Sequence, residues 1–306
     1  MYSLDQLKRG FASPNLFFRE ANRLYHRRLN TRTHNISGID VFSEDWDNLL
    51  LLDACRYDMF AEQSDLRGQL ESRISRGSST AEFLKGNIRD RELHDTVYIT
   101  ANPQFYRLQD QLGASFHAVE NVWMREGWDE DYNTVLPETM TAAAFDAAEQ
   151  YPDKRLFIHY IQPHYPFIVD NSELFDNEQA FLKPDEAGSW HQLMTGELTA
   201  SRNDVWRAYR DNLSRTLPHV NELLDGLEGK SVVSSDHGNM VGERAYPFPI
   251  REWGHPRGIY TEQLVKIPWL VIQGERREIV SQPPLDEHEE TDDDIVADRL
   301  EQLGYV

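Results

Sequence analysis

Three short apolar runs, each followed by a polar residue, constrain the fold of this chain more than any other feature of its sequence. Residues 49–52 are four leucines, and Asp53 follows them directly. The segments "DTVYITAN" and "RLFIHYIQPH" repeat this design and stop at Asn102 and His164. A continuous apolar run is typical of a central strand covered on both faces, and a polar residue at its carboxyl end indicates a functional edge of the sheet.

Helical patterns alternate with these runs. The segment "LPETMTAAAFDAAEQYP" predicts a helix that begins at Pro137 and ends before Pro152. Residues 204–227 have helical spacing and lead into a short strand at 231–235; a last strand, "IPWLVIQG", precedes a C-terminal helix. Strands and helices in alternation predict an α/β domain with a mainly parallel central sheet.

The composition excludes some classes of partner. The chain has 306 residues, 40% of them hydrophobic, which is enough for one large domain. Its 52 acidic and 31 basic residues give a net charge of −21, so we expect no nucleic-acid partner. Such an acidic surface is also typical of a halophilic protein, because concentrated salt screens the repulsion between carboxylates.

The N-terminal part of the chain differs from the rest. We expect residues 1–40 to form a basic helical segment and residues 41–306 to form the catalytic domain. Within residues 14–28 apolar side chains gather near one helical face among arginines, so the helix either packs on the domain or makes peripheral contact with an anionic membrane. The chain has no apolar run of about 18 residues and no apolar core of a signal peptide, which predicts a cytoplasmic location.

Acidic and imidazole side chains follow two of the predicted strands. Asp53 ends the first strand, while Asp236 and His237 end the strand in "GKSVVSSDHGNMVGE". Because the carboxyl ends of parallel strands meet at one edge, these three side chains are candidate ligands of a divalent metal ion. Three protein donors leave coordination positions open for a substrate, as in catalytic metal sites.

Four segments, taken in order, resemble the alkaline phosphatase and sulfatase superfamily. They are "LLLLDACRYD", "HYIQPHYPF", the stretch from "SSDHGNMVGE" to "REWGHPRGIYTEQLVKIPWLVI", and the tail "DRLEQLGYV". The resemblance implies an alkaline phosphatase-like three-layer sandwich and one divalent ion, Mn²⁺, Mg²⁺, Ca²⁺ or Zn²⁺, held by Asp53, Asp236 and His237. It also implies that His164 and His255 face the substrate.

The resemblance further implies a hydroxyl nucleophile in "SRGSSTAEFLKGN". Thr80 is the first candidate, because it stands where the family places its nucleophile at the start of a helix. Ser78 is the alternative, because phosphoglycerol-transferase-like members place a threonine four residues before a similar "E-F". The same residues could simply cap the helix, with Ser79 and Glu82 forming a capping box.

The sequence departs from the family pattern at two positions. The single cysteine, Cys55, lies in "CRYDM" and cannot be the modified cysteine of sulfatases, so we expect it to be a small buried residue. Tyr160 stands where two-metal members carry an additional ligand, which favours a single ion. His159 lies five residues before His164, and strand alternation predicts that these two side chains point to opposite faces, so His159 is left outside the site.

Together these features predict an enzyme that acts on an anionic ester. In-line attack by Thr80 or Ser78 on a phosphate or sulfate ester would give a covalent intermediate. Water as the second acceptor makes the protein a hydrolase, and a glycan or lipid hydroxyl makes it a transferase. A noncatalytic binding protein with the same fold is the third alternative, which the intact Asp53, Asp236 and His237 disfavour. The sequence predicts no oligomeric state.

Overall fold

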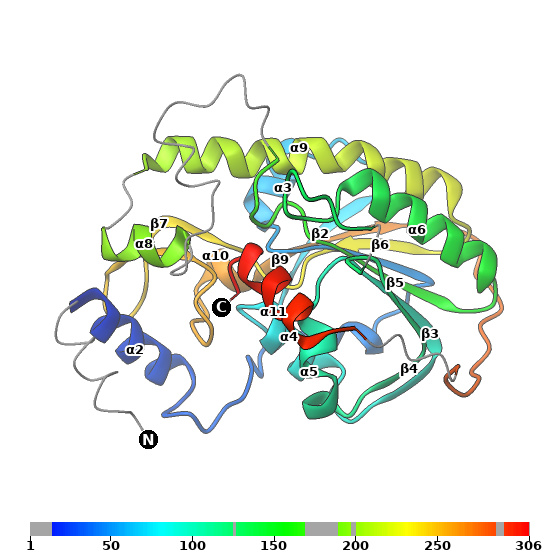
Figure 1. Ribbon diagram of the computed structural model, residues 1–306, viewed down its shortest axis with the longest axis horizontal. Helices are drawn as coiled ribbons and strands as arrows, with labels where there is room; N and C mark the ends of the chain where they lie inside the picture. The colour runs from blue at the N-terminus through cyan, green and yellow to red at the C-terminus, as the bar shows by residue number, and fades with distance from the viewer. Residues whose placement is uncertain (1–13, 125–126, 169–188, 197–199, 286–290, 306) are drawn as a thin grey trace.

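The computed structural model describes residues 14–124, 127–168, 189–196, 200–285 and 291–305. A seven-stranded sheet in the order β2-β9-β6-β1-β5-β3-β4 forms the centre of the molecule (Figure 1). The pairs from β6 to β4 are parallel, whereas β9 is antiparallel to both β6 and β2. Its strands are β1 (Asn48–Leu52), β2 (Gln69–Ile74), β3 (Glu92–Thr100), β4 (Ser115–Asn121), β5 (Arg155–Tyr160), β6 (Ser231–Ser234) and β9 (Lys266–Ile272).

Helices cover both faces of this sheet. Leu50 and Leu52 of β1 belong to a core cluster with residues of α3, α6, α9 and α11, whereas Leu49 and Leu51 belong to a second cluster with residues of α4 and α5. The helices are α2 (Pro14–His26), α3 (Tyr57–Gln63), α4 (Thr80–Asn87), α5 (Gln104–Leu112), α6 (Pro137–Gln150), α8 (Ser189–Thr195), α9 (Arg202–Gly226), α10 (Glu262–Val265) and α11 (Asp293–Gln302), with a short 3₁₀ helix at Val41–Ser43. The predicted α/β class, the mainly parallel sheet and the three-layer arrangement are confirmed.

The side chains of β1 point alternately into the two core clusters, which explains the run of leucines in this strand. Successive side chains of a strand point to opposite faces, so a strand with helices on both sides needs apolar residues at every position. All five residues of β1 are buried. The helix predicted from Pro137 is also confirmed, because α6 begins at that proline and ends at Gln150.

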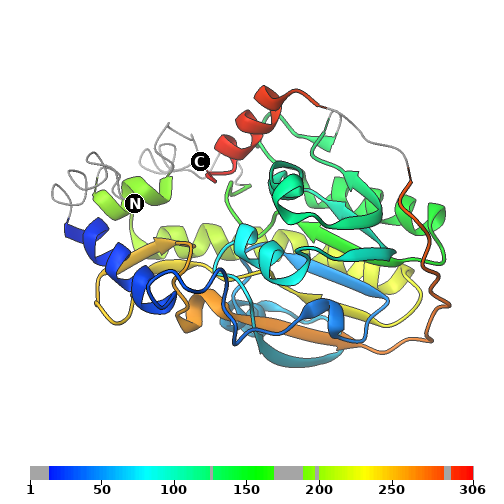
Figure 2. The ribbon, with the colours of Figure 1, turned by 90° about the horizontal axis from the view of Figure 1, so that it is seen from below.

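Helix α2 lies at one end of the molecule beside the two-stranded ribbon of β7 (Met240–Arg244) and β8 (Arg251–Gly254) (Figures 1 and 2). The side chain of Asn22 is buried and makes hydrogen bonds with the backbone of Phe248 in both directions, at 2.9 and 2.7 Å. The helix therefore packs on the domain, as one of the two alternatives predicted. In the described residues, no helix is long and apolar enough to cross a bilayer. The division at residue 40 and the membrane contact stay predictions, and residues 1–13 lie outside the described ranges.

Candidate active site

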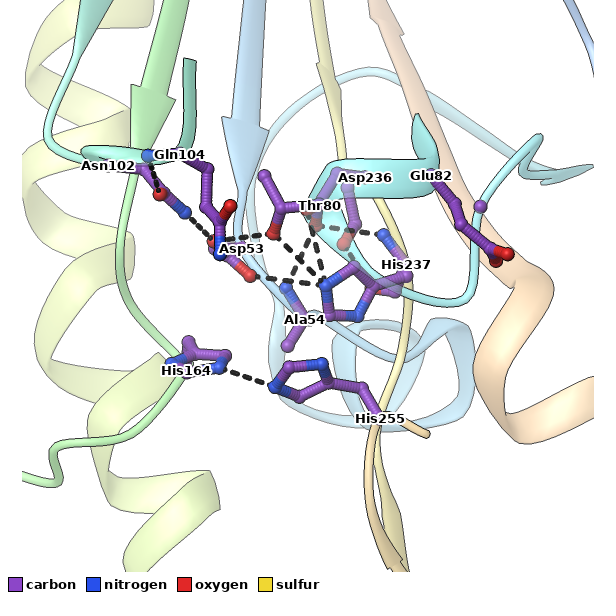
Figure 3. A network of polar contacts seen from close by, with 12 residues as sticks. Asp53, Ala54, Thr80, Glu82, Asn102, Gln104, His164, Asp236, His237 and His255 are labelled. Carbon is purple, nitrogen blue, oxygen red and sulfur yellow. Dashed lines mark hydrogen bonds and ion pairs between the residues drawn. The ribbon is translucent and has the colours of Figure 1, made fainter. Parts of the chain in front are cut away.

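The candidate ligands converge at the carboxyl ends of two neighbouring strands, β1 and β6 (Figure 3). Asp53 follows β1, and Asp236 and His237 come shortly after the end of β6. Strand β1 pairs in parallel with β6 on one side and with β5 on the other. The register of these pairs, set by the buried apolar runs, brings the polar residues at the strand ends to one place.

A tight turn after β1 presents Asp53 to the site. Ala54 has a φ of 60°, a left-handed conformation that is uncommon for a residue with a side chain. Its N–H donates to Asp236 Oδ1 at 3.0 Å, and its carbonyl accepts a hydrogen bond from the Tyr209 hydroxyl. The next residue, Cys55, is buried as predicted, and its N–H donates to Ser235 Oγ at 2.9 Å. These contacts hold a strained turn of the kind that clusters at functional sites.

Asp236 has one carboxylate oxygen anchored and one free. Oδ1 accepts hydrogen bonds from the N–H groups of Ala54, at 3.0 Å, and His237, at 2.8 Å. Oδ2 is buried without a hydrogen-bond partner among the residues that the structure describes, and His237 Nε2 lies 3.3 Å from it. His237 Nδ1 bonds the carbonyl of Gly238 at 2.8 Å, which directs its Nε2 toward the two carboxylates.

Asp53 follows the same pattern. Its Oδ2 accepts from Asn102 Nδ2 at 2.6 Å and from the Tyr305 hydroxyl at 2.8 Å. Its Oδ1 is buried and has no hydrogen-bond partner in the described part of the chain, although His237 Nε2 lies 3.5 Å away. One oxygen is thus fixed by the protein while the other is left for a ligand.

His159 is a fourth member of this group, and the prediction that it lies outside the site was wrong. Its Nδ1 bonds the Tyr98 hydroxyl at 2.9 Å, and its Nε2, free of hydrogen bonds within the described ranges, lies 3.7 Å from Asp53 Oδ2 and 4.0 Å from Asp236 Oδ2. Strand alternation did not apply, because β5 ends at Tyr160 and His164 follows in a loop. His159 therefore joins the site from the strand and His164 from the loop.

The free atoms fit a divalent metal ion. Asp53, His159 and Asp236 are fully buried, and one ligand atom from each lies within 4.8 Å of the others. Buried polar atoms are almost always paired, and an unpaired buried carboxylate oxygen is costly, so an unpaired atom on each of three neighbouring residues indicates a cation. Oxygen and imidazole donors suit Mg²⁺, Mn²⁺ and Zn²⁺, and a hydrogen bond that fixes the second atom of each ligand is typical of metal sites.

The electrostatics of the group agree with this. Burial, and then the charge of Asp236, raise the pKa of Asp53 well above its ordinary value. Burial would also raise the pKa of Asp236, but His237, His159 and the Ala54 N–H hold it below its ordinary value. Burial lowers the pKa of His159 to about 4, which keeps its imidazole neutral and able to bind a metal at neutral pH.

The structure separates the two candidate nucleophiles. Thr80, the first residue of α4, has its Oγ1 3.3 Å from Asp53 Oδ2 and 3.3 Å from His237 Nε2. The Ser78 hydroxyl instead donates to Glu82 Oε2 at 3.0 Å, and its oxygen lies 3.1 Å from Pro256 O. Thr80 is therefore in contact with the candidate metal ligands, whereas Ser78 is bonded elsewhere.

The capping box predicted for Ser79 and Glu82 was wrong. Ser79 is the N-cap of α4, but its side chain makes no capping hydrogen bond. The buried Glu82 carboxylate instead accepts hydrogen bonds from the N–H groups of Ser78, at 3.3 Å, and Gly258, at 3.2 Å. A contact with the loop after β8 thus replaces the local contact that the sequence pattern predicts.

His164 and His255 stand together beside the ligand group (Figure 3). Their Nε2 atoms are 2.8 Å apart, and the His255 ring lies 4.7 Å from the ring of His237. Burial lowers the pKa of His164 to about 4, and burial followed by the nearby His237 and His164 lowers that of His255 well below 6.5. Both shifts favour the neutral form of these rings at neutral pH.

Tyr305 and Asn102 are parts of the site that the sequence did not assign. The Tyr305 hydroxyl bonds Asp53, accepts from Asn102 Nδ2 at 2.7 Å and lies 3.3 Å from Thr80 Oγ1. Its ring stacks on His164 at 5.0 Å. Asn102 carried a signal, because it ends the second apolar run, whereas nothing near Tyr305 in the sequence indicates that the C-terminal tail returns to Asp53.

No protein-family model matches the chain, and no curated protein matches it. Solved structures that match it include the integral membrane lipooligosaccharide phosphoethanolamine transferase A from Neisseria meningitidis, at 14% identity and a TM-score of 0.46. That match covers 74% of this chain and 47% of the transferase, so the chain spans about half of that protein's length.

Two further solved structures also match the chain. A protein in the alkaline phosphatase superfamily from Vibrio parahaemolyticus matches at 12% identity and a TM-score of 0.42, over 85% of this chain and 70% of that one. A phosphonate monoester hydrolase from Silicibacter pomeroyi matches at 12% identity and a TM-score of 0.45, over 84% of this chain and 72% of that one.

Proposed function

We propose that this protein is a metal-dependent hydrolase of phosphate or sulfate esters that uses Thr80 as its nucleophile. The observation that supports this most strongly is the pattern of anchored and free atoms in the buried Asp53, His159 and Asp236. One ligand atom from each of these three residues lies within 4.8 Å of the others, beside a hydroxyl that touches Asp53. This combination of a divalent-metal site and a hydroxyl group suits attack on an anionic ester.

In this proposal Asp53, His159 and Asp236 hold one divalent ion, with His237 as an additional donor. When bound, the ion offsets the negative charge of the ester and favours the ionised form of the hydroxyl. Thr80 Oγ1 attacks the phosphorus or sulfur, the bond to the leaving alcohol breaks, and the group becomes esterified to Thr80. Asp53 Oδ2, 3.3 Å from Oγ1, is the nearest acceptor for the hydroxyl proton, because the Nε2 lone pair of His237 would be used by the ion.

The remaining residues bind and orient the substrate. Thr80 begins α4, so the positive end of the helix dipole lies beside the nucleophile and favours an anion there. His164 Nδ1 donates to the carbonyl of Tyr165, so the neutral His164 accepts from His255 at Nε2, and the N–H of this pair that is left for an ester oxygen is that of His255. Attack of water on the Thr80 ester then releases phosphate or sulfate and restores the hydroxyl.

The alternative is transfer of a phosphorylated head group to a glycan or lipid hydroxyl. The chemistry at Thr80 is the same, and only the second acceptor differs. The exposed aromatic side chains of α2, Phe17 and Tyr25, favour this alternative, because they lie among arginines and could meet a lipid surface.

Turnover of small substrates tests the proposal. Protein stripped of metal is given Mn²⁺, Mg²⁺, Ca²⁺ or Zn²⁺ in high salt and assayed on an aryl phosphate, an aryl phosphodiester and an aryl sulfate. We expect metal-dependent cleavage that falls at least ~10³-fold in Thr80→Ala and stays near the wild-type rate in Ser78→Ala. Metal binding without turnover on any substrate would favour the transferase, and full activity of Thr80→Ala would exclude Thr80 as the nucleophile.

A further inference from the structure

We infer that α2 and the turn between β7 and β8 form one surface that docks on an anionic lipid bilayer. We call it the docking surface; its apolar members are Phe17, Phe18, Tyr25, Leu29, Tyr246 and Phe248. What the docking surface implies about the substrate rests on the proposed function, because docking would bring the candidate active site to esters carried by a membrane. The docking itself can be measured without any catalysis.

Buried polar contacts join the two segments of the docking surface. Asn22 holds the backbone of Phe248 through both its N–H and its carbonyl. His26 Nε2 lies 2.7 Å from the carbonyl of Tyr246, and Arg19 pairs with the fully buried Glu252 of β8. The two segments, more than 200 positions apart in sequence, are therefore fixed side by side at one end of the molecule (Figures 1 and 2).

The aromatic rings of this surface are exposed and in contact with one another. Phe17, Tyr25 and Tyr246 are 59%, 44% and 61% exposed. The rings of Phe18 and Phe248 are 5.4 Å apart, and those of Tyr25 and Tyr246 are 5.7 Å apart. Single exposed apolar residues are normal on a soluble protein, but a contiguous group from two segments indicates an interaction surface. Aromatic rings next to basic residues are typical of helices that lie in a membrane interface.

The charge of the docking surface is opposite to that of the protein. Residues 14–32 contain five arginines and one glutamate, in a chain with a net charge of −21. Arg27 and Arg28 stand at the end of α2 next to Tyr25, and the guanidinium of Arg28 lies 5.9 Å from that ring. Such a local excess of positive charge attracts anionic lipid headgroups. A second copy of the chain is a poor occupant, because the same arginines would face one another across a symmetric contact.

The docking surface is connected to the candidate site. Phe248 precedes β8, and His255 follows β8 directly. The aliphatic part of Arg27 packs against Gly258, three residues after His255. A protein docked in this way would hold the substrate-facing loop close to the headgroups, so the geometry points to a phosphate or sulfate ester carried by a membrane lipid.

Vesicle binding of the full chain tests the inference. Sedimentation with phosphatidylglycerol-containing vesicles at 0.15 M salt, compared with pure phosphatidylcholine vesicles, should show binding to the anionic vesicles only. The double variant Arg27→Gln/Arg28→Gln should bind about 10- to 30-fold more weakly, from roughly fivefold per arginine near a charged surface. Phe17→Ala/Phe248→Ala should lose about tenfold or more, because buried ring area contributes to insertion.

Matched controls lie elsewhere on the molecule. Arg207→Gln/Arg210→Gln removes the same charge from α9, and Ile295→Ala removes an exposed apolar side chain from α11; both should bind like the wild type. Asp236→Ala should also bind vesicles normally, which separates docking from the proposed catalysis. Absence of binding to anionic vesicles, or equal loss in the α2 and α9 variants, would overturn the inference, and binding only to an acidic protein would do the same.

Discussion

Each candidate metal ligand has one side-chain atom held by the protein, and the group that holds it should control how tightly an ion binds. Tyr305 donates to Asp53 Oδ2 at 2.8 Å. Burial and the nearby Asp53 and Asp236 carboxylates raise the pKa of Tyr305 above its ordinary value, so the hydroxyl stays protonated and can only donate to Asp53. The orientation of this carboxylate therefore depends on the last turn of the chain.

Tyr305→Phe should weaken metal affinity about 10- to 100-fold, the usual effect of removing a group that orients a ligand. The phenyl ring can keep its stacking on His164, so the fold should not change. Calorimetric titration of the stripped protein measures the affinity, and Tyr246→Phe, at an exposed tyrosine, is the control. Equal affinities in Tyr305→Phe and wild type would exclude this role.

The raised pKa of Asp53 makes the stability of the metal-free protein depend on pH. Because the folded state holds this proton more tightly than the unfolded state, the contribution is fully present below the unfolded pKa. It is lost as pH rises through the folded pKa. Asp236 acts oppositely: its lowered pKa contributes stability that is lost as pH falls below the ordinary carboxyl range.

Urea unfolding in EDTA across pH should therefore show a loss of unfolding free energy in the wild type as pH rises above the ordinary carboxyl range. In Asp53→Asn this loss should be absent, because the amide does not ionise. Saturating metal should also suppress it in the wild type, because the bound cation replaces the proton. The same decrease with rising pH in Asp53→Asn would show that another group is responsible.

Among the secondary-structure elements, the N-terminus of helix α4 is held in place by contacts with residues outside the helix. The buried Glu82 carboxylate links the segment before Thr80 to Gly258, and it accepts from the Ser78 N–H, the Ser78 hydroxyl and the Gly258 N–H. The position of the candidate nucleophile therefore depends on the loop that also carries His255.

Glu82→Gln should destabilise the protein by about 1–3 kcal/mol, because an amide NH₂ would face donors that need an acceptor. Glu149→Gln, at an exposed position in α6, should change the unfolding free energy by less than about 0.5 kcal/mol. Thermal or urea unfolding of both variants checks the difference. If Glu82→Gln were as stable as Glu149→Gln, the buried carboxylate would not be what fixes α4.

The strands and the residues at their ends show how much of the fold and of the candidate site could be predicted from the sequence. The apolar runs predicted the strands, and the rule for parallel sheets predicted that Asp53, Asp236 and His237 meet at one edge. His159 was missed because period-two alternation was extended beyond the end of β5. Tyr305 was missed because its hydrogen-bond partners are more than 200 residues away in sequence, and no local pattern encodes these bonds.

The whole molecule carries a strong negative charge, which should make its stability depend on salt. At a net charge of −21 the carboxylates repel one another, and the screening length falls from about 10 Å at 0.1 M salt to about 3 Å at 1 M. We expect the melting temperature to rise by several degrees between ~0.1 and ~2 M KCl. A melting temperature that falls or stays constant over this range would contradict a halophilic surface.

The most direct test of the proposed site is to count the metal ions that it binds. Calorimetric titration of the stripped wild-type protein with Mn²⁺, Mg²⁺, Ca²⁺ or Zn²⁺ should show one tightly bound ion per chain. Affinity should fall at least ~100-fold in Asp236→Asn and in His159→Ala, and it should be unchanged in Ser78→Ala. Failure of all four ions to bind, or wild-type affinity in Asp236→Asn, would contradict a metal centre at Asp53, His159 and Asp236.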